Sequence, residues 1–224
     1  MMKLLSGLRD GWFKLMAKQL RLPSGLLAKL TGNSMNKSNE VLYHLTLENL
    51  NLKDGDNVLE IGFGNGKFFS ELNAKANELK ITGIDHSPEM VTEALRLNRS
   101  LYESGRLKAM AGSSDCMPFD NDSFDKIFCI NVIYFWENPA LHLQEIHRVL
   151  KPGGYFCIGI RPKENLMKFP FAKYGFTLYS AEECKNLVEE NGFQFVKSQD
   201  GKDFEQNTNQ LNTPFESLCV VFVK

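Results

Sequence analysis

From residue 54 onward, the chain alternates short apolar runs with segments of helical spacing. The apolar runs are typical of buried strands and cover residues 58–61, 79–85, 107–111, 126–132 and 155–160. A helix is predicted to begin at Ser87-Pro88-Glu89, because serine caps helices, proline fits the first turn and glutamate favours the positive end. This helix should stop at Gly105, and further helices are predicted over residues 139–150 and after Ser180. The alternation predicts a doubly wound α/β fold, with a parallel sheet and helices on both faces.

Two parts of the chain depart from this alternation. Near the carboxyl end, the apolar runs 193–198 and 217–223 have no helix between them, so we expect an antiparallel hairpin beside the parallel strands. The first thirty residues carry six basic residues and one acidic residue, and their apolar residues fall on one half of a helix that Pro23 would end. Residues 26–30 should stop at Thr31-Gly32-Asn33, with a polar linker over residues 33–39. We therefore expect an N-terminal basic amphipathic helical cap, residues 1–37, and a main domain, residues 38–224.

The overall composition excludes several classes of protein. Hydrophobic residues make up 43% and charged residues 24% of the 224 residues, which argues against a disordered or fibrous chain. The net charge of −1 argues against nucleic-acid binding, and the longest uncharged apolar run, 127–136, is too short to span a bilayer. The start lacks the pattern of a signal peptide. Five scattered cysteines and four unclustered histidines predict free thiols in a reducing cytoplasm and no metal site.

A glycine-rich loop carries the main chemical signal. Gly62, Gly64 and Gly66 directly follow the first predicted strand and precede a helix. Glycines here permit a tight turn and let a ligand approach the backbone, while free N–H groups at the start of a helix can donate to an anion. Glu60 precedes the loop, and Asp85 ends the next strand, where a carboxylate can accept hydrogen bonds from ribose hydroxyls. The pattern predicts a nucleoside-binding site in preference to a structural turn.

The spacing of the glycines separates two kinds of ligand. A dinucleotide-binding loop, G-x-G-x-x-G, would need glycine at position 67, which is occupied by Lys67. No Gly-Lys-Ser/Thr sequence closes the loop, so it is not a P-loop. An NAD-dependent oxidoreductase on the same kind of sheet remains an alternative, although the position of Gly66 and the final hairpin both count against it.

Four ordered motifs resemble the class I S-adenosylmethionine-dependent methyltransferases, and within them the methyltransferase type 11 group, which includes enzymes similar to the ubiquinone/menaquinone methyltransferases. The motifs are VLEIGFGNG (58–66), GIDHSPEM (83–90), MPFDNDSFD (117–125) and RVLKPGG (148–154). The resemblance covers about residues 55–160. It implies a Rossmann-like fold with strand order 3-2-1-4-5-7-6, S-adenosylmethionine as cofactor, S-adenosylhomocysteine as product and a methyltransferase activity (EC 2.1.1.-).

The resemblance also assigns roles to matched residues. Glu60 would orient the loop and help to hold the methionine end of the cofactor, the glycines would pass beneath it and Asp85 would hold the ribose. Ser113 stands where the family has an acid that accepts from the adenine amino group, and a hydroxyl accepts more weakly than a carboxylate. The expected cofactor-binding residues are Glu60, Gly62, Phe63, Gly64, Gly66, Asp85, His86, Met90, Ser113, Ser114 and Asn131.

Candidates for the acceptor side follow the fourth strand. The aromatic run at residues 134–136 either forms a wall near the acceptor or packs in the core beneath a loop, and Asn131 either faces the site or caps the strand. His142 and His147 are expected at the surface. The expected acceptor-side residues are Tyr134, Phe135, Trp136 and Trp12, and no catalytic base is assigned.

The expected reaction is an in-line displacement that moves a methyl group to a small-molecule or lipid-like acceptor. Nucleic-acid amino methyltransferases usually carry an Asn/Asp-Pro-Pro-aromatic turn after the fourth strand, and residues 130–134 contain no proline. The sequence therefore favours a small molecule or lipid over DNA or RNA. A non-catalytic S-adenosylmethionine-binding module is a second alternative, which turnover with an acceptor would exclude.

Three roles are open for residues 1–30. In the first, which we favour, they form a lid over the cofactor cleft, and an apolar face that includes Trp12 lines the acceptor space. In the second, they form an interfacial helix that gives peripheral membrane contact, with Lys and Arg on anionic headgroups. In the third, they form a surface helix packed on the edge of the sheet. Gly7 and Gly11 favour the lid, because they weaken a free-standing helix.

Overall fold

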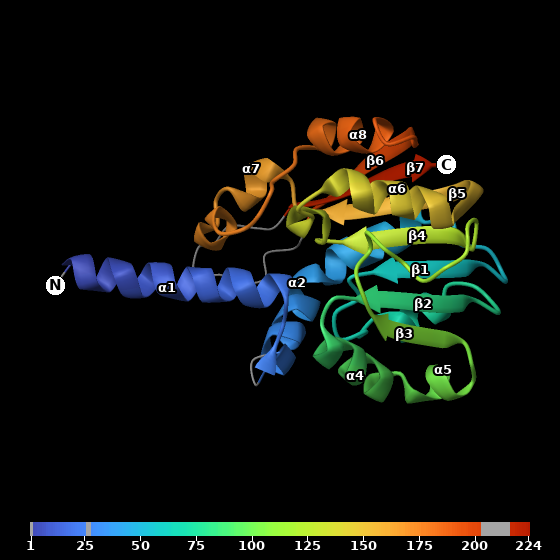
Figure 1. The fold of residues 1–224 in the computed structure, drawn as a ribbon, viewed down its shortest axis with the longest axis horizontal. Coiled ribbons are helices and arrows are strands. Elements are labelled where there is room, and N and C mark those ends of the chain that lie inside the picture. The colour runs from blue at the N-terminus through green and yellow to red at the C-terminus, as the bar shows by residue number, and fades with distance from the viewer. Residues whose placement is uncertain (1, 26–27, 203–215) are drawn as a thin grey trace.

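The computed structural model describes residues 2–25, 28–202 and 216–224, and a seven-stranded sheet forms its centre (Figure 1). The strands are β1 (Asn57–Ile61), β2 (Lys80–Asp85), β3 (Leu107–Ala111), β4 (Phe124–Ile130), β5 (Leu150–Ile160), β6 (Gln194–Lys202) and β7 (Glu216–Val223). Their order is β3-β2-β1-β4-β5-β7-β6. Strands β1 to β5 are parallel, whereas β7 runs antiparallel to both β5 and β6. The predicted Rossmann-like sheet, its strand order and its final hairpin are confirmed.

Helices cover both faces of the sheet, and a hydrophobic cluster fills each interface (Figure 1). One cluster joins Phe128 of β4 to Tyr43 and Phe69, and the other joins Phe156 of β5 to Ile146 and Val188. The first face is covered by α2 (Ala28–Asn49), α3 (Phe69–Asn73), α4 (Pro88–Leu97) and α5 (Arg99–Glu103), and the second by α6 (Pro139–Val149), α7 (Lys163–Leu166) and α8 (Ala181–Glu189). Burial of each large apolar side chain contributes about 1.5–3 kcal/mol.

The predicted helix starts at Ser87 and Ser180 are confirmed. The Ser87 hydroxyl accepts from the N–H of Met90, and Ser180 forms a capping box with Glu183. The helix that begins after Ser87 is interrupted at Asn98, which gives α4 and α5 in place of the single helix we expected. The side-chain amide of Asn98 donates to the carbonyl oxygens of Ala94 and Gly66, at 2.9 and 2.8 Å, and so fastens the break to the glycine loop.

Helix α2 is continuous from Ala28 to Asn49, so the expected stop at Thr31-Gly32-Asn33 and the linker over residues 33–39 are wrong. Gly32 is buried, and a Cβ atom there would lie 3.3 Å from Nδ2 of Asn65. Glycine lets α2 pack closely on the glycine loop, and this tertiary contact outweighs the helix cost of glycine, about 1 kcal/mol. The expected boundary after residue 37 falls inside α2, and residues 26–27 of the expected apolar segment lie outside the described residues.

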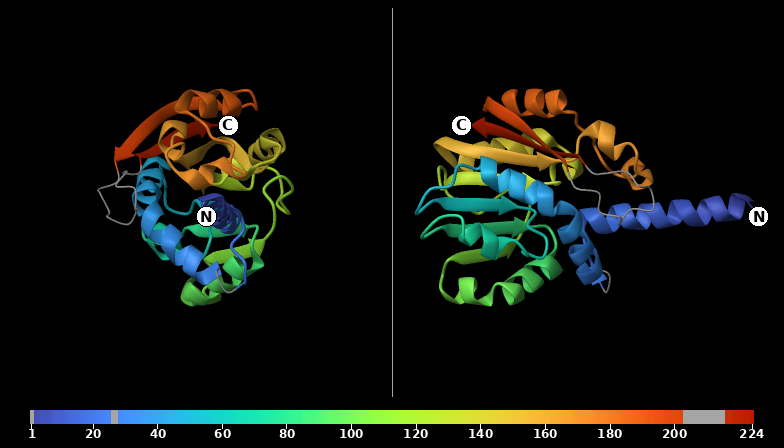
Figure 2. Two further views of the ribbon diagram at one scale, coloured as in Figure 1. Left: turned by 90° about the vertical axis from the view of Figure 1, so that its left-hand side faces the viewer. Right: turned by 180° about the vertical axis from the view of Figure 1, so that it is seen from behind.

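Helix α1 (Met2–Arg21) ends just before Pro23, as predicted. Figures 1 and 2 show that it extends beyond the carboxyl ends of the parallel strands and away from the sheet. Its carboxyl-terminal half contacts the short helix η3 (Pro170–Lys173), where Ala17 is buried, whereas Trp12 is 60% exposed. The apolar face of α1 therefore does not fold over the site in this structure. None of the helices in the described part of the chain has the length and apolar character that a bilayer-crossing segment needs.

Candidate cofactor site

The glycine loop connects β1 to α3 at the carboxyl edge of the sheet. Gly62, Gly64 and Gly66 adopt φ values of +72°, +57° and +65°, a region that glycine enters without steric cost. A Cβ atom on Gly62 would lie 2.3 Å from Cγ2 of Val132, whereas a Cβ atom on Gly64 would meet no other atom within 4 Å. The backbone at Gly64 therefore borders open space, where a ligand can approach it closely.

Asp85 holds this loop from the end of β2. Its Oδ2 atom accepts a hydrogen bond from the N–H of Gly64 at 2.8 Å, and its Oδ1 atom accepts from the N–H of Ser87 at 2.9 Å. Burial raises the pKa of Asp85 to about 6, although both N–H groups and the nearby His86 favour the ionised form. Each oxygen keeps a further acceptor position, so the carboxylate can also accept from the two hydroxyls of a ribose.

Glu60 is a second buried carboxylate beside the loop. It is 5% exposed, and its Oε2 atom accepts a hydrogen bond from the hydroxyl of Tyr43 on α2 at 3.0 Å. Burial raises the pKa of Glu60 to about 8, and the charge of Asp85 acts in the same direction, whereas the bond from Tyr43 partly offsets them. The site therefore concentrates two carboxyl groups whose ionised forms a cationic ligand would stabilise.

The residues expected around the adenine are only partly brought together. His86 is exposed directly after Asp85, and the hydroxyl of Ser113 donates to the carboxylate of Asp115. The other two candidates are held in the interior: Met90 is 1% exposed, and Oγ of Ser114 lies 2.8 Å from Nδ1 of His142. In this structure Ser114 and Met90 are therefore engaged within the protein.

His142 is a correction to the sequence analysis, which expected it at the surface. Its side chain is 8% exposed and stacks on Trp136 with ring centroids 4.8 Å apart and planes 7° apart. Burial lowers the pKa of His142, against the attraction of Asp115. The contact with Ser114 and the stacking explain why this polar residue occupies a core position on α6.

The aromatic run after β4 divides between the core and the partly exposed surface. Tyr134 and Trp136 are buried, as the core-packing alternative predicts, and the Tyr134 hydroxyl donates to the carbonyl oxygen of Arg161 at 2.9 Å. Phe135 is half-buried and packs edge-on against Phe176 with centroids 4.7 Å apart. Phe135 is thus the member of the run with a ring at the surface of this region, and Trp12 lies apart from it on α1 as an exposed residue.

Asn131 connects the end of β4 to helix α2. It adopts φ +57°, its Nδ2 atom donates to Oδ1 of Asn39 at 3.0 Å, and its Oδ1 atom lies 3.2 Å from the hydroxyl of Tyr134, as an alternative acceptor for the proton that this hydroxyl donates to Arg161. Sequence reasoning missed both Asn39 and Tyr43, because they precede the first motif. The sequence does contain a signal for them, because both have hydrogen-bonding side chains on the helix that directly precedes the strand before the glycine loop.

The end of α1 contacts residues that follow two different strands. The hydroxyl of Ser87 donates to the carbonyl oxygen of Pro23 at 2.7 Å, and the guanidinium of Arg21 lies 2.7 Å from the carboxylate of Glu137. Ser87 follows β2, and Glu137 follows β4 and η2 (Ile133–Phe135). The last turn of α1 and the residues after it therefore connect the segments that follow β2 and β4 at the carboxyl edge of the sheet.

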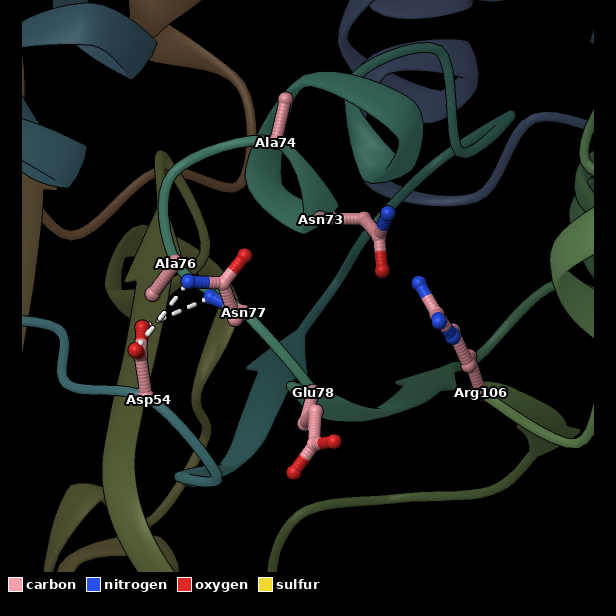
Figure 3. Close-up of a pocket in the computed structure, with 7 residues that line it drawn as sticks. All are labelled: Asp54, Asn73, Ala74, Ala76, Asn77, Glu78 and Arg106. Carbon is pink, nitrogen blue, oxygen red and sulfur yellow. Dashed lines mark hydrogen bonds between the residues drawn. The ribbon is translucent and has the colours of Figure 1, made fainter.

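A separate cavity of about 660 Å³ lies at the opposite, amino edge of the parallel strands (Figure 3). Here Asp54 accepts hydrogen bonds from the backbone N–H and the side-chain amide of Asn77, and Arg106 forms another part of the wall. This cavity contains none of the expected site residues. It is far along the strands from Glu60 and Asp85, so we do not assign the cofactor to it.

Comparison with known proteins identifies the family. Residues 59–158 match the family described as "Methyltransferase domain". YrhH of Bacillus subtilis, a protein named as a methyltransferase, is 31% identical over 124 residues, which cover 55% of this chain and 68% of that protein. The phthiotriol/phenolphthiotriol dimycocerosates methyltransferase of Mycobacterium leprae is 30% identical over 132 residues, covering 58% of this chain and 47% of that protein. A Haloferax volcanii methyltransferase, solved in complex with the Trm112 methyltransferase activator, has a TM-score of 0.74 at 24% identity and covers 86% of this chain and 92% of its own.

The chain belongs to the class I S-adenosylmethionine-dependent methyltransferases and carries a methyltransferase type 11 domain. It is a methyltransferase that uses S-adenosylmethionine, so the expected enzyme class and cofactor are confirmed and the NAD-dependent alternative is set aside. The described residues fit this cofactor. Gly64 leaves the backbone approachable, Asp85 has acceptor positions for ribose hydroxyls, and buried Glu60 suits a ligand that carries positive charge.

Proposed function

We propose that this methyltransferase transfers the methyl group to a small-molecule or lipid-like acceptor, with the cofactor held between the glycine loop and Asp85. The observation that carries the proposal is the 2.8 Å bond from the N–H of Gly64 to Asp85, beside open space at Gly64. This bond sets the loop at the position where a nucleoside would lie. Asp85 would accept from the ribose hydroxyls, and Glu60 would face the charged methionine end.

Further cofactor contacts follow from the positions of the expected residues. Gly62 and Gly66 would shape the loop, and Phe63, whose ring packs 5.2 Å from Phe69, would contribute its backbone. His86 would border the adenine from the solvent side. Ser113 would hold the adenine amino group only if its hydroxyl turned from Asp115, so backbone groups of the same loop are the better acceptors. Asn131, which follows β4, would border the cofactor on the side next to the glycine loop.

S-adenosylmethionine supplies a methyl group bonded to a positively charged sulfur with a neutral leaving group. The protein's contribution is alignment and exclusion of water, and positioning of this kind supplies up to about 7–11 kcal/mol of a barrier. Asn39, Asn131 and Tyr134 form a connected hydrogen-bonded series that fixes the end of β4 next to the acceptor side. The Tyr134 hydroxyl does not suit a general base, because burial raises its pKa and it already donates to Arg161.

The acceptor class is supported by the apolar character of the side opposite the cofactor. Phe135, Phe171 and Phe176 are half-buried, and Phe176 packs against the other two at 4.7 and 5.8 Å. Rings of this kind suit an apolar acceptor better than a nucleic-acid backbone, whose binding needs a cationic groove. The mycobacterial relative, which is named for the methylation of dimycocerosates, favours the same class.

Two measurements test this proposal. Calorimetry should show binding of S-adenosylhomocysteine and none of NAD. Radiolabelled methyl groups from S-adenosylmethionine should then appear in lipid or small-molecule fractions of a cell extract, and Phe135→Asp should abolish this transfer while leaving S-adenosylhomocysteine affinity within a few-fold. Transfer into nucleic acid, or transfer unaffected by Phe135→Asp, would overturn the acceptor class. Phe195→Asp, on β6, is the matched control because Phe195 is a part-buried aromatic residue on another element.

A further inference from the structure

Helix α1 is fastened at one end and free at the other. Ala17 is buried, Lys14 Nζ lies 5.6 Å above the ring of Tyr174, and Arg21 pairs with Glu137. Amino-terminal to these contacts the helix extends away from the domain, on the side where the parallel strands end (Figures 1 and 2). A helix held in this way presents a long surface that the rest of the described chain does not cover.

This free surface carries large apolar side chains. Trp12 is 60% exposed and Leu15 is 41% exposed, and their spacing of three residues places them on neighbouring turns of one side. Met167, which follows the last residue of α7, is 64% exposed, and α7 lies at the same end of the molecule as α1 (Figure 1). Seven large hydrophobic residues are exposed in the described part of the chain, and these three are on or next to α1 and α7, whereas the other four are distributed over α4, α5, α6 and β6.

The charge of α1 is strongly basic. Helix α1 carries five basic residues and one acidic residue, a sum of +4 in a chain whose net charge is −1. At 100° per residue, Arg9 lies one turn from Trp12 and Lys18 one turn from Leu15, and both basic residues are exposed. Lys14 and Arg21 lie on the opposite side of the helix, where they contact Tyr174 and Glu137. Exposed apolar residues that are flanked by basic residues, on a helix of low net hydrophobicity, are typical of a helix that lies in the interface of a membrane.

We propose that α1 docks this enzyme on an anionic lipid surface, which deepens the proposed function by making the acceptor a molecule that resides in or on that surface. Arg9 and Lys18 would contact anionic headgroups while Trp12 and Leu15 enter the boundary of the acyl chains. A second copy of the chain is a poorer partner for the same face, because it would bring two helices of like charge together. Helix α1 is joined to the domain by the hydrogen bond between Ser87 and Pro23 and by the ion pair between Arg21 and Glu137. When it docks, it therefore places the lipid surface at the end of the sheet that holds the site.

The test uses the full chain and vesicles of phosphatidylcholine, with and without phosphatidylglycerol. We expect the protein to co-sediment with the anionic vesicles at low salt and to be released at high salt. Emission from Trp12 should shift to shorter wavelength on binding, and this change can be resolved because the other tryptophan, Trp136, is already buried. Binding to both kinds of vesicle with no salt dependence would show that the surface need not be anionic and would contradict the proposal. Absence of binding to either kind of vesicle would show that α1 does not dock on lipid.

Two double variants separate the contributions of the apolar and the basic residues of α1 to vesicle binding. Trp12→Ser with Leu15→Ser, and Arg9→Glu with Lys18→Glu, should each weaken vesicle binding about 10-fold or more. Leu97→Ser with Tyr102→Ser is the matched control, because it removes two exposed apolar residues from α4 and α5 and should leave vesicle binding unchanged. Vesicle binding that survives both α1 variants would contradict the proposal. So would a dimer that forms with rising concentration and is lost in the apolar variant, because it would identify a second copy as the partner.

Titration of S-adenosylhomocysteine into every variant keeps this inference separate from the proposed function. If all variants bind it with similar affinity while only the α1 variants lose vesicle binding, both proposals hold. If none binds it, including the unmodified chain, the cofactor site is wrong, and the vesicle result still decides whether α1 docks. Thermal unfolding of each variant shows whether a loss of binding reflects a loss of fold.

Discussion

The hydroxyl of Tyr43 on α2 donates a 3.0 Å hydrogen bond to Oε2 of Glu60 at the end of β1, inside the protein. Tyr43 is fixed for this contact because its ring stacks on Phe68 at 4.2 Å and meets Phe128 edge-on at 5.8 Å. The helix that precedes the first strand therefore supplies a hydrogen bond that favours the ionised form of Glu60 and partly offsets the effect of burial on its pKa.

Glu60→Gln should make the cofactor-free protein more stable at pH 8 than the unmodified chain. The pKa of Glu60 is raised to about 8 in the folded state, so between about pH 4.5 and 8 the folded chain holds more protons than the unfolded one. The free energy of unfolding consequently falls as pH rises through this window. Glutamine cannot ionise and therefore removes that loss. In denaturant titrations, the difference in the free energy of unfolding between the variant and the unmodified chain should be larger at pH 8 than at pH 5, by on the order of 2 kcal/mol or more.

The same substitution should reduce the pH dependence of cofactor binding. In the unmodified chain, affinity for S-adenosylmethionine should increase from pH 6 to pH 8, because the ionised form of Glu60 suits a positively charged ligand. The Glu60→Gln variant should bind more weakly at pH 8 and with a flatter profile, whereas Glu103→Gln, an exposed control, should leave the profile unchanged. A flat profile in the unmodified chain would contradict the role of Glu60.

Asp85→Ala should weaken binding of S-adenosylmethionine by at least about 10-fold. The carboxylate is available to two ribose hydroxyls and also fixes the N–H groups of Gly64 and Ser87, and hydrogen bonds to charged groups contribute about 1.5–3 kcal/mol each. Asp54→Ala is the control, because Asp54 likewise accepts two hydrogen bonds, both from Asn77, at the far edge of the sheet. Equal dissociation constants for the two variants in calorimetry would show that Asp85 does not hold the ribose.

Gly64→Ala and Gly55→Ala form a matched pair that separates backbone strain from ligand contact. Both glycines have positive φ, +57° and +80°, and an added Cβ atom meets no neighbour within 4 Å at either. Each substitution should lower the free energy of unfolding by about 1–2 kcal/mol. Only Gly64→Ala should also reduce affinity for S-adenosylhomocysteine, by about 10-fold or more, because its methyl group enters the space beside the loop. Similar affinities in both variants would place the cofactor elsewhere.

Local sequence signals determined much of this fold and part of the site. The caps at Ser87 and Ser180, the glycine loop and the acid at the end of β2 are all specified by neighbours in the chain, and these predictions agree with the described helices and loop. The strand order came from the resemblance to a family and not from spacing. Glu60 and Asp85 lie at the same edge of the sheet, because parallel strands bring their carboxyl ends to one edge.

What could not be predicted depends on contacts between distant residues. Gly32 in a polar segment predicts the end of a helix, and only its packing against Asn65 explains why the helix continues. Nothing near Tyr43 in the chain indicates that its hydrogen-bond partner lies 17 residues away. The polarity of His142 indicated the surface, whereas its burial depends on Ser114, 28 residues earlier, and on stacking with Trp136. In each case a tertiary contact overrides a local preference.

His142→Gln should make the protein less sensitive to acid. Burial lowers the pKa of His142 in the folded state, so below its ordinary value, about 6.5, the unfolded chain binds more protons and the free energy of unfolding falls with falling pH. Glutamine can keep a hydrogen bond to Ser114 but cannot take up a proton. Denaturant titrations at pH 7.5 and pH 5 should therefore show a smaller loss of stability at pH 5 in the variant than in the unmodified chain, although the variant is less stable at pH 7.5 because it loses stacking on Trp136.

His147→Gln is a control on the same helix, with a half-buried ring whose pKa burial also lowers, and it should reduce the acid sensitivity less. An acid-dependent loss that is the same in His142→Gln as in the unmodified chain would mean that His142 keeps an ordinary pKa and that the Ser114 contact does not hold it neutral.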